Sequence, residues 1–194
     1  MDAHLPAPTG VTDDVVALWR LQAAYADVVT RRAWDELHGL FLPTTAVLVD
    51  TVRAPAMTMV GPDELGSFIG GAIERFDYFA FVILNTVVDL DAGGDDEAAG
   101  RIFMCEIRHE PAVDEWHNAY GCYQDVYRRV AGRWWFADRR YRSMARTGPT
   151  AAVAGLPPGL GPLGPFAAPG PSDAPGEPGA SGPADAQVEG RFAG

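Results

Sequence analysis

His109 is the side chain in this sequence best suited to transferring a proton, because an imidazole titrates near neutral pH. It follows the segment FMCEIR, in which strand alternation would place it on one face with Phe103, Cys105 and Ile107. If that face lines a pocket, His109 is a candidate general acid or base. The alternative is a half-exposed histidine at a strand end, beside the turn at Pro111.

Tyr25 and Asn85 are polar groups set within apolar patterns. The Tyr25 hydroxyl could donate a hydrogen bond to a ligand, or its ring could pack in the core. Asn85 interrupts the apolar segment FAFVILNTVVDL, and a buried amide needs partners. It could orient a ligand or bond to the neighbouring backbone.

Two pairs of residues are expected to meet across adjacent strands. Asp125 is expected to pair with Arg139 or Arg140, which indicates a structural role by default. Cys105 and Cys122 face each other if the hairpin between their strands turns midway through residues 112–115. We interpret them as free, buried thiols rather than a disulfide.

The sequence shows no motif for metal binding, nucleotide binding, serine hydrolysis or Schiff-base chemistry. His4, His38 and His117 are isolated, with no metal-ligand spacing on a common element, so we expect no metal. The glycine-rich nucleotide loops and the GxSxG motif are missing, and we expect no cofactor. All 15 basic residues are Arg, so the sequence offers no lysine for a Schiff base.

Charge and hydropathy limit the partners. The net charge of −11, without a basic stripe, argues against nucleic acid. The apolar runs are too short for a membrane span, and the first ten residues lack the features of a signal peptide. We therefore expect a cytoplasmic protein that binds neither nucleic acid nor membrane.

The remaining patterns predict an α+β domain. Apolar spacing and capping residues predict helices over about 13–30, 33–41 and 61–76. Alternating patterns and turn residues predict strands over 46–52, 78–90, 98–110, 117–130 and 133–142. Helices followed by strands with short turns indicate three helices packed on a strongly curved, mostly antiparallel sheet, forming a cone with a pocket.

The composition changes sharply near the end of this domain. Residues 147–194 are rich in Gly, Pro and Ala, with Phe166 and Phe192 as the aromatic residues. Such a segment cannot bury enough apolar surface to offset its ordering entropy. We expect a flexible N-terminus over 1–11, a folded domain over 12–146 and a disordered tail over 147–194.

Several segments together resemble one family. They are YADVVTRRAWDELHGLF, GPDELGSF, the Asn85 strand and the hairpin GCYQDVYRRVAGRWWFADRRY. In this order they resemble the SnoaL-like branch of the nuclear transport factor 2-like superfamily, which includes relatives of scytalone dehydratase and polyketide cyclases. The resemblance implies a cone-shaped fold with a hydrophobic pocket, often dimeric through the sheet.

The sequence departs from dehydratase-like members at their proton-transfer pair. Thr30 stands where an acid is common, and Phe81 and Val82 stand where a histidine is common. Neither a hydroxyl nor an apolar group can replace that pair near neutral pH. We expect Thr30, Phe81, Asn85 and Phe103 to contact the substrate, and His109 and Tyr25 to act on it.

Two functions follow from this pattern. The first is a cofactor-independent dehydratase, isomerase or cyclase acting on an apolar polyketide-, terpene- or steroid-like molecule. The second is a non-catalytic ligand-binding or structural module, including a role like that of a dioxygenase small subunit. A homodimer through the sheet is expected in either case, with Trp134, Trp135 and Tyr141 on the exposed face.

Overall fold

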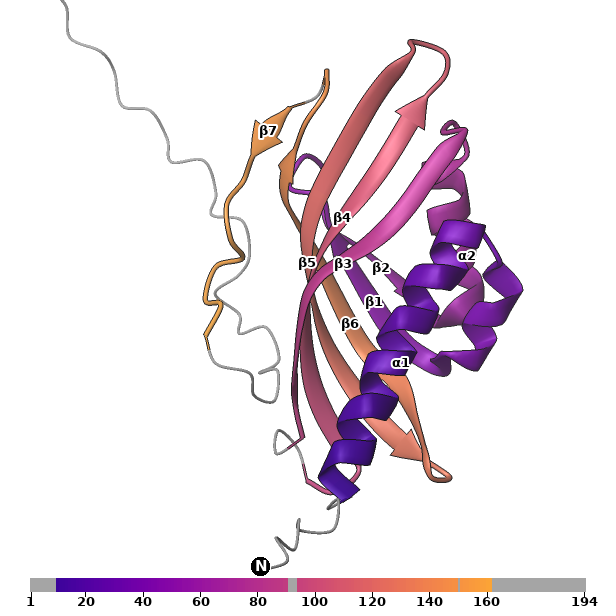
Figure 1. Cartoon of the computed structure of the whole chain (residues 1–194), viewed down its shortest axis with the longest axis vertical. Helices are drawn as coiled ribbons and strands as arrows, with labels where there is room; N and C mark the ends of the chain where they lie inside the picture. The colour runs from indigo at the N-terminus through magenta and orange to yellow at the C-terminus, as the bar shows by residue number, and fades with distance from the viewer. Residues whose placement is uncertain (1–9, 91–93, 150, 162–194) are drawn as a thin grey trace, which may run out of the picture.

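The computed structural model describes residues 10–90, 94–149 and 151–161. These residues form an α+β domain whose helices cover one side of a curved, mixed sheet (Figure 1). The predicted fold class is confirmed. The expectations for residues 1–9 and for the tail from residue 162 onward concern parts of the chain outside the described residues.

The first helix, α1 (Gly10–Arg31), confirms the predicted long helix. Its apolar stripe packs on the sheet, and Leu18, Tyr25 and Val28 are almost fully buried. At its C-terminal end Arg31 forms an ion pair with Glu36 of the next element, with 2.7 Å between Nη2 and Oε2. This contact fixes the direction in which the chain leaves the helix.

The segment after α1 differs from the prediction in two ways. The predicted second helix is a short 3-10 helix, η1 (Trp34–Gly39), and the next strand, β1 (Phe41–Asp50), begins before Pro43. The proline is accommodated because the register between β1 and its neighbour β6 shifts between Phe41 and Ala46. Within that irregular stretch the Thr45 hydroxyl donates to the Phe136 carbonyl at 2.7 Å.

A four-residue strand, β2 (Met57–Val60), was not predicted, because four residues are too few for a clear alternation. It leads directly into α2 (Gly61–Ile73), which confirms the third helix. Gly61 has φ of +77°, and an added Cβ would lie 2.7 Å from the Pro43 carbonyl oxygen. This junction therefore requires glycine. The Glu64 carboxylate accepts the Val60 N–H at 2.8 Å and caps the helix start.

Four long strands complete the sheet. They are β3 (Tyr78–Asp89), β4 (Glu97–Glu110), β5 (Glu115–Val130) and β6 (Arg133–Arg146). The seven-stranded sheet has the order β2-β1-β6-β5-β4-β3, with β7 (Ala152–Val153) on β6. Among the pairs formed by described residues, β1 with β6 is parallel and the others are antiparallel.

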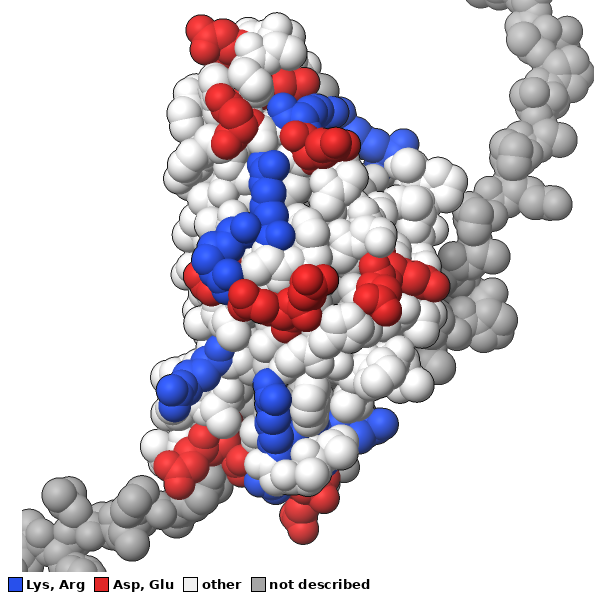
Figure 2. All heavy atoms as spheres, turned by 90° about the vertical axis from the view of Figure 1, so that its right-hand side faces the viewer, with Lys and Arg blue, Asp and Glu red and all other residues white. Residues whose placement is uncertain are grey.

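The two faces of the sheet have different surroundings. Helices α1 and α2 lie on the concave face, whereas residues 154–161, which follow β7, lie on the side away from the helices (Figure 1). Basic and acidic side chains are interspersed on the side that carries the helices (Figure 2). The core lies between the helices and the concave face, where Ile102, Met104 and Tyr127 are fully buried.

The prediction of an exposed face bearing Trp134 and Tyr141 is wrong. Trp134 is 6% exposed and Tyr141 is 7% exposed, and both point to the concave side. A register shift near Val126 and Tyr127 places Phe136 and Tyr141 on the same face although they are an odd number of residues apart. Trp135 points the other way and lies against Arg133, whose guanidinium is 4.3 Å from its ring centroid.

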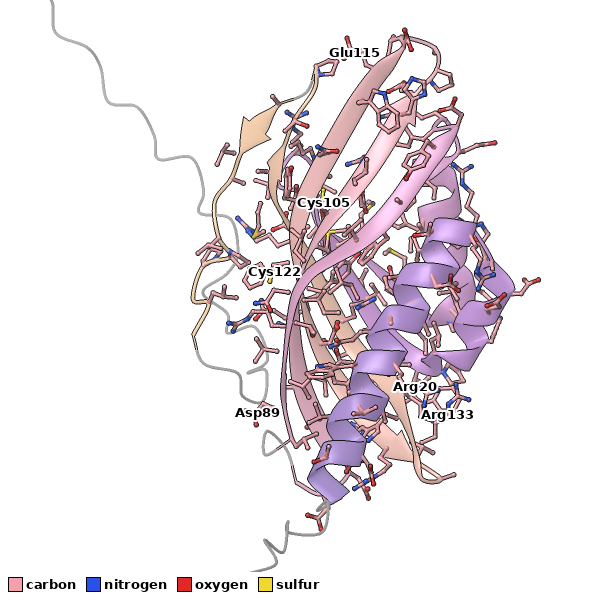
Figure 3. The ribbon with its side chains drawn as sticks, viewed as in Figure 1. Arg20, Asp89, Cys105, Glu115, Cys122 and Arg133 are labelled. Carbon is pink, nitrogen blue, oxygen red and sulfur yellow. The ribbon has the colours of Figure 1, made fainter. Side chains whose placement is uncertain are left out.

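The two cysteines do not face each other directly. The hairpin turns over Pro111–Asp114, so Glu110 pairs with Glu115, Cys105 with Tyr120 and Cys122 with Phe103. The sulfur atoms belong to free, buried thiols on neighbouring strands (Figure 3). The predicted register was two residues off because the turn covers residues 111–114 instead of 112–115, with Asp114 at a φ of +52°.

The described chain continues past the expected domain end at residue 146. Ala152 and Val153 pair with Arg146 and Ala145, and the N–H groups of Ala154 and Gly155 donate to the Met144 carbonyl. Further on, Arg101 Nη2 donates to the Gly161 carbonyl at 2.6 Å. Residues 151–161 thus lie against the convex face of the sheet.

Candidate active site

A partly open pocket of about 240 Å³ lies between the two helices and the concave face of the sheet. Apolar side chains of α1, α2 and β1 form one side of it, among them Val29, Val47, Leu65 and Ile69. The polar groups come from the long strands and from the chain after α2: Glu106, Arg108, Tyr123, Tyr141, Arg146 and Arg75, together with Tyr25 on α1 and Thr51 after β1. A mainly apolar cavity with a few convergent polar groups is the usual form of a small-molecule site.

Glu106 is the carboxylate in the lining of this pocket, and the sequence analysis missed it. It lies on β4 opposite Phe81 of β3 and Ala119 of β5, and its side chain is 21% exposed. Burial raises the pKa of its carboxyl group, and the positive charges of Arg108 and Arg146 oppose that rise. A carboxyl group with a raised pKa inside a pocket is suited to general acid–base catalysis.

His109 and Glu106 lie on opposite faces of β4, and the sequence analysis chose the face of His109. Choosing the face of His109 selects the odd-numbered residues, but the even-numbered residues point into the cone. Ala98, Ile102 and Met104 are buried there, in phase with Glu106. An acid in phase with an apolar run was the available signal.

Three tyrosines, Tyr25, Tyr123 and Tyr141, line the same pocket. Tyr25 is 2% exposed, and burial raises the pKa of its hydroxyl while the charge of Arg139 opposes the shift. Burial raises the pKa of Tyr141 to about 12 and raises that of Tyr123 as well. All three phenols therefore stay protonated near neutral pH and can donate hydrogen bonds to a ligand oxygen.

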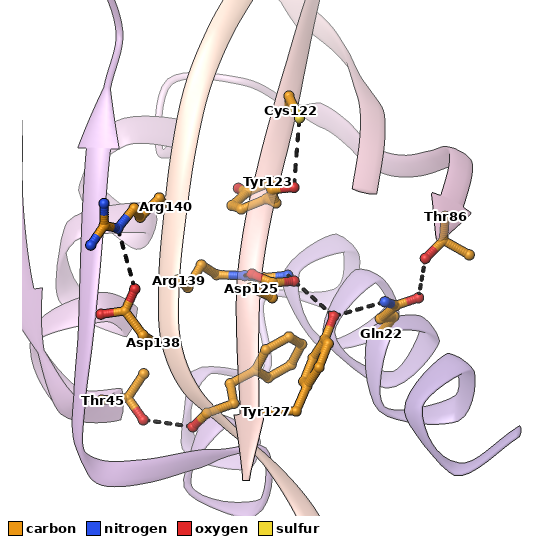
Figure 4. A network of polar contacts seen from close by, with 11 residues as sticks. Gln22, Thr45, Thr86, Cys122, Tyr123, Asp125, Tyr127, Asp138, Arg139 and Arg140 are labelled. Carbon is orange, nitrogen blue, oxygen red and sulfur yellow. Dashed lines mark hydrogen bonds and ion pairs between the residues drawn. The ribbon is translucent and has the colours of Figure 1, made fainter. Parts of the chain in front are cut away.

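A buried polar network lies beneath this pocket (Figure 4). Asp125 and Arg139, both fully buried, form the expected ion pair at 2.8 Å and 3.1 Å. The Asp125 carboxylate also accepts the Tyr127 hydroxyl, which accepts Gln22 Nε2 at 2.7 Å. The guanidinium carbon of Arg139 lies 4.1 Å from the Tyr25 ring centroid. Arg139 thus links this network to the Tyr25 ring, against which it packs.

His109 is placed outside the pocket, on the convex side of the sheet. Its Nδ1 is 2.6 Å from Asp77 Oδ1, its Nε2 is 3.3 Å from Asp114 Oδ1, and its ring lies beside Trp116. The hydrogen bond with Asp77 raises the pKa of the imidazole. The structure therefore does not bring His109 and Tyr25 to one point, because the two side chains are on opposite faces of the sheet.

Of the four residues expected to contact the substrate, one lines the pocket and three do not. Phe81 lines the pocket and its ring packs against Tyr25. Thr30 is exposed and accepts the Phe81 N–H at 3.0 Å, so it ties α1 to β3 instead of facing the cavity. Asn85 is exposed and pairs with Phe103, and both lie on the convex side. A register shift between Ile83 and Asn85 moves this asparagine away from the face of Phe81.

A second hollow of about 590 Å³ opens between α1 and the β5–β6 hairpin, near Arg20 and Arg133 (Figure 3). Asp14, one of its two acidic residues, already accepts Trp134 Nε1 at 2.7 Å and pairs with Arg129 at 3.0 Å. This hollow is larger but more open to solvent than the first pocket. The pocket beneath the helices is the better candidate site.

The described residues contain neither a cluster of metal-ligating side chains nor a membrane-spanning helix. Among residues 10–90, 94–149 and 151–161, no three His, Cys, Asp or Glu side chains are grouped so that they could hold a metal ion. Within the same residues, no helix combines the length and apolar character needed to span a membrane.

A curved sheet with an apolar pocket beneath its helices is the fold that the family resemblance implied. The chain belongs to the SnoaL-like domain family, whose model matches residues 11–140. No curated protein gives a match to the sequence.

Solved structures share this fold at low sequence identity. A proposed scytalone dehydratase from Novosphingobium aromaticivorans is 22% identical, with a TM-score of 0.63, over 78% of this chain and 97% of that one. The hexachlorocyclohexane dehydrochlorinase LinA-type3 from Novosphingobium barchaimii is 16% identical, with a TM-score of 0.62, over 81% and 97%. At these identities the likeness concerns the fold.

Proposed function

We propose that this protein binds a compact, mainly apolar molecule in the pocket beneath the helices and transfers a proton on it without a cofactor, as a dehydratase, isomerase or cyclase. The observation that carries the proposal is the Glu106 carboxyl group, with its raised pKa, in the wall of an apolar cavity. The dehydratase and dehydrochlorinase among the similar structures support an elimination-type reaction.

Each polar group has a defined part in the proposed reaction. Glu106 takes a proton from the carbon next to a ligand carbonyl, and the tyrosine hydroxyls donate to the oxygen on which charge develops. In a dehydration, the electrons of the broken C–H bond form the new C=C bond. The C–O bond at the next carbon breaks, and its oxygen leaves as water with the proton from Glu106.

The size of the cavity narrows the ligand class. A volume of about 240 Å³ is below the range of about 300–1,000 Å³ that is typical of ligand sites. The expected ligand classes are polyketide-, terpene- and steroid-like molecules. A one- or two-ring compound fits this volume better than a steroid, which has four rings. His109 has no part in this proposal because it lies on the opposite face of the sheet.

The alternative is a binding module without catalysis. It is favoured by Thr30 and Val82, which stand where dehydratase-like members have an acid and a histidine. In that case Glu106 would orient the ligand and transfer no proton. Either function is compatible with the same pocket, so the two must be separated by a measurement of proton transfer.

Hydrogen–deuterium exchange tests the proposal directly. One- and two-ring ketones are incubated with the protein in D₂O, and exchange at the carbon next to the carbonyl is followed by NMR, alongside thermal-shift binding. We expect exchange with the wild type, none with Glu106→Gln, and retained binding in that variant. Thermal shifts without exchange would favour the binding module, and the absence of any shift would contradict a ligand pocket.

The expected homodimer through the sheet also remains a proposal. Tyr78, Val87 and Trp116 provide exposed apolar surface at described positions of β3 and β5, in place of the buried Trp134 and Tyr141. Light scattering after size exclusion tests it. We expect twice the chain mass for the wild type and a shift toward the monomer for Trp116→Glu; a monomeric wild type contradicts the dimer.

A further inference from the structure

Three arginines gather at one end of the pocket. Arg108 from β4, Arg146 from the end of β6 and Arg75 from the chain after α2 all line the cavity. The same three side chains line a small adjoining hollow with His117 and Asn118. One end of an otherwise apolar pocket is therefore cationic.

The positive charges at this end are not fully balanced. Arg108 Nη2 lies 3.3 Å from Glu106 Oε2, and Arg75 Nε lies 3.4 Å from Glu110 Oε2. Arg146 forms no ion pair with any described residue, and its Nε donates to the Ser143 hydroxyl at 3.5 Å. Three guanidinium groups face two carboxylates, which leaves one positive charge without a counter-ion.

Two of these guanidinium groups pack against the same aromatic ring. Arg75 and Arg108 both lie over the ring of Phe76, at 4.7 Å and 5.3 Å from its centroid. The Arg108 side chain is 11% exposed, and its buried Nε has no hydrogen-bond partner among the described atoms. A buried donor without a partner is costly, and a ligand oxygen could satisfy it.

From this arrangement we infer that the ligand is an amphipathic monoanion, a one- or two-ring molecule whose carboxylate lies between Arg146 and Arg108. A guanidinium fork matches the two oxygens of a carboxylate, and one negative charge neutralises the cluster. The apolar body extends along Val47, Leu65 and Ile69, where the lining carries no charge. The inference deepens the proposed function and rests on the same pocket.

A matched pair of probes tests the charge requirement. Binding of 2-naphthylacetate and of 2-naphthylacetamide, which share shape and differ in charge, is measured by calorimetry on the full chain. We expect the carboxylate to bind at least tenfold more tightly than the amide. Its affinity is also expected to fall with added NaCl, because salt screens the attraction, while that of the amide stays constant.

A matched pair of variants assigns the effect to Arg146. Arg146→Gln is expected to remove most of the preference for the carboxylate while leaving amide binding unchanged. Arg20→Gln removes one charge from an exposed position outside the pocket and is expected to keep the preference. Equal binding of both probes by the wild type overturns this inference alone. Failure of both probes to bind overturns the pocket proposal as well.

Discussion

Glu106 Oε2 lies 3.3 Å from Arg108 Nη2, and both side chains point from one face of β4 into the pocket. The contact sets two tendencies against each other at one carboxyl group. Burial favours its neutral form, and the neighbouring guanidinium favours its charged form. The net effect is a raised pKa, which a base needs in order to accept a proton near neutral pH.

The first prediction concerns this pair. Arg108→Gln removes a charge that lowers the pKa of Glu106, so that pKa should rise further. The folded-state pKa of Glu106 already exceeds the usual 4.5. The contribution of this group to the free energy of unfolding therefore falls as pH rises from 4.5 through the folded-state pKa, and above that pKa the contribution is constant. In the variant this decline should extend to higher pH. Urea unfolding across pH measures it, with Arg20→Gln as the control; unchanged curves would contradict it.

The second prediction concerns the ion pair beneath the pocket. Arg139→Met leaves the fully buried Asp125 carboxylate without its cation, which should cost about 3–5 kcal/mol in the free energy of unfolding. The double variant Arg139→Met with Asp125→Leu should recover part of that loss, because no unpaired charge remains. Urea denaturation of the two variants and the wild type gives the comparison. A loss below 1 kcal/mol for the single variant would be inconsistent with full burial.

The third prediction uses two glycines. In Gly121→Ala the new Cβ would lie 2.1 Å from Cε2 of Tyr141, so the ring must move toward the pocket. We expect a loss of about 1–3 kcal/mol in stability and weaker ligand binding. Gly71→Ala is the control: it lies on α2 with open space around its Cβ position and should gain about 0.5–1 kcal/mol. Thermal unfolding compares them, and equal melting temperatures would contradict the close contact.

The fourth prediction concerns His109. Its hydrogen bond with Asp77 raises the imidazole pKa above 6.5, so the stabilising contact is fully present below 6.5 and is lost as pH rises through the folded value. NMR titration should show the raised pKa, and Asp77→Asn should lower it. His109→Ala should leave ligand binding and proton exchange intact, since the residue faces away from the pocket. Loss of exchange in this variant would restore His109 as a candidate catalyst.

Much of the architecture was predictable from local pattern. The stripe of α1, the proline at the start of α2 and the alternation of the long strands are short-range signals, because each depends on neighbouring residues. The strand β2 is too short to show such a signal. The start of β1 was missed because Pro43 usually ends a strand, and only pairing with β6 shows the irregularity that admits it.

By itself the sequence determined the order of the helices and strands, the family, and the presence of Tyr25 and Phe81 on the pocket side. The tertiary structure decided which face of β4 points inward, and with it the exchange of His109 for Glu106 as the candidate base. The physical reason is the twofold period of a strand: alternate residues belong to opposite faces, and only packing against the helices selects the inner one. The arginine cluster could likewise not be predicted from the sequence, because Arg75, Arg108 and Arg146 come from separate segments that meet only in the folded chain.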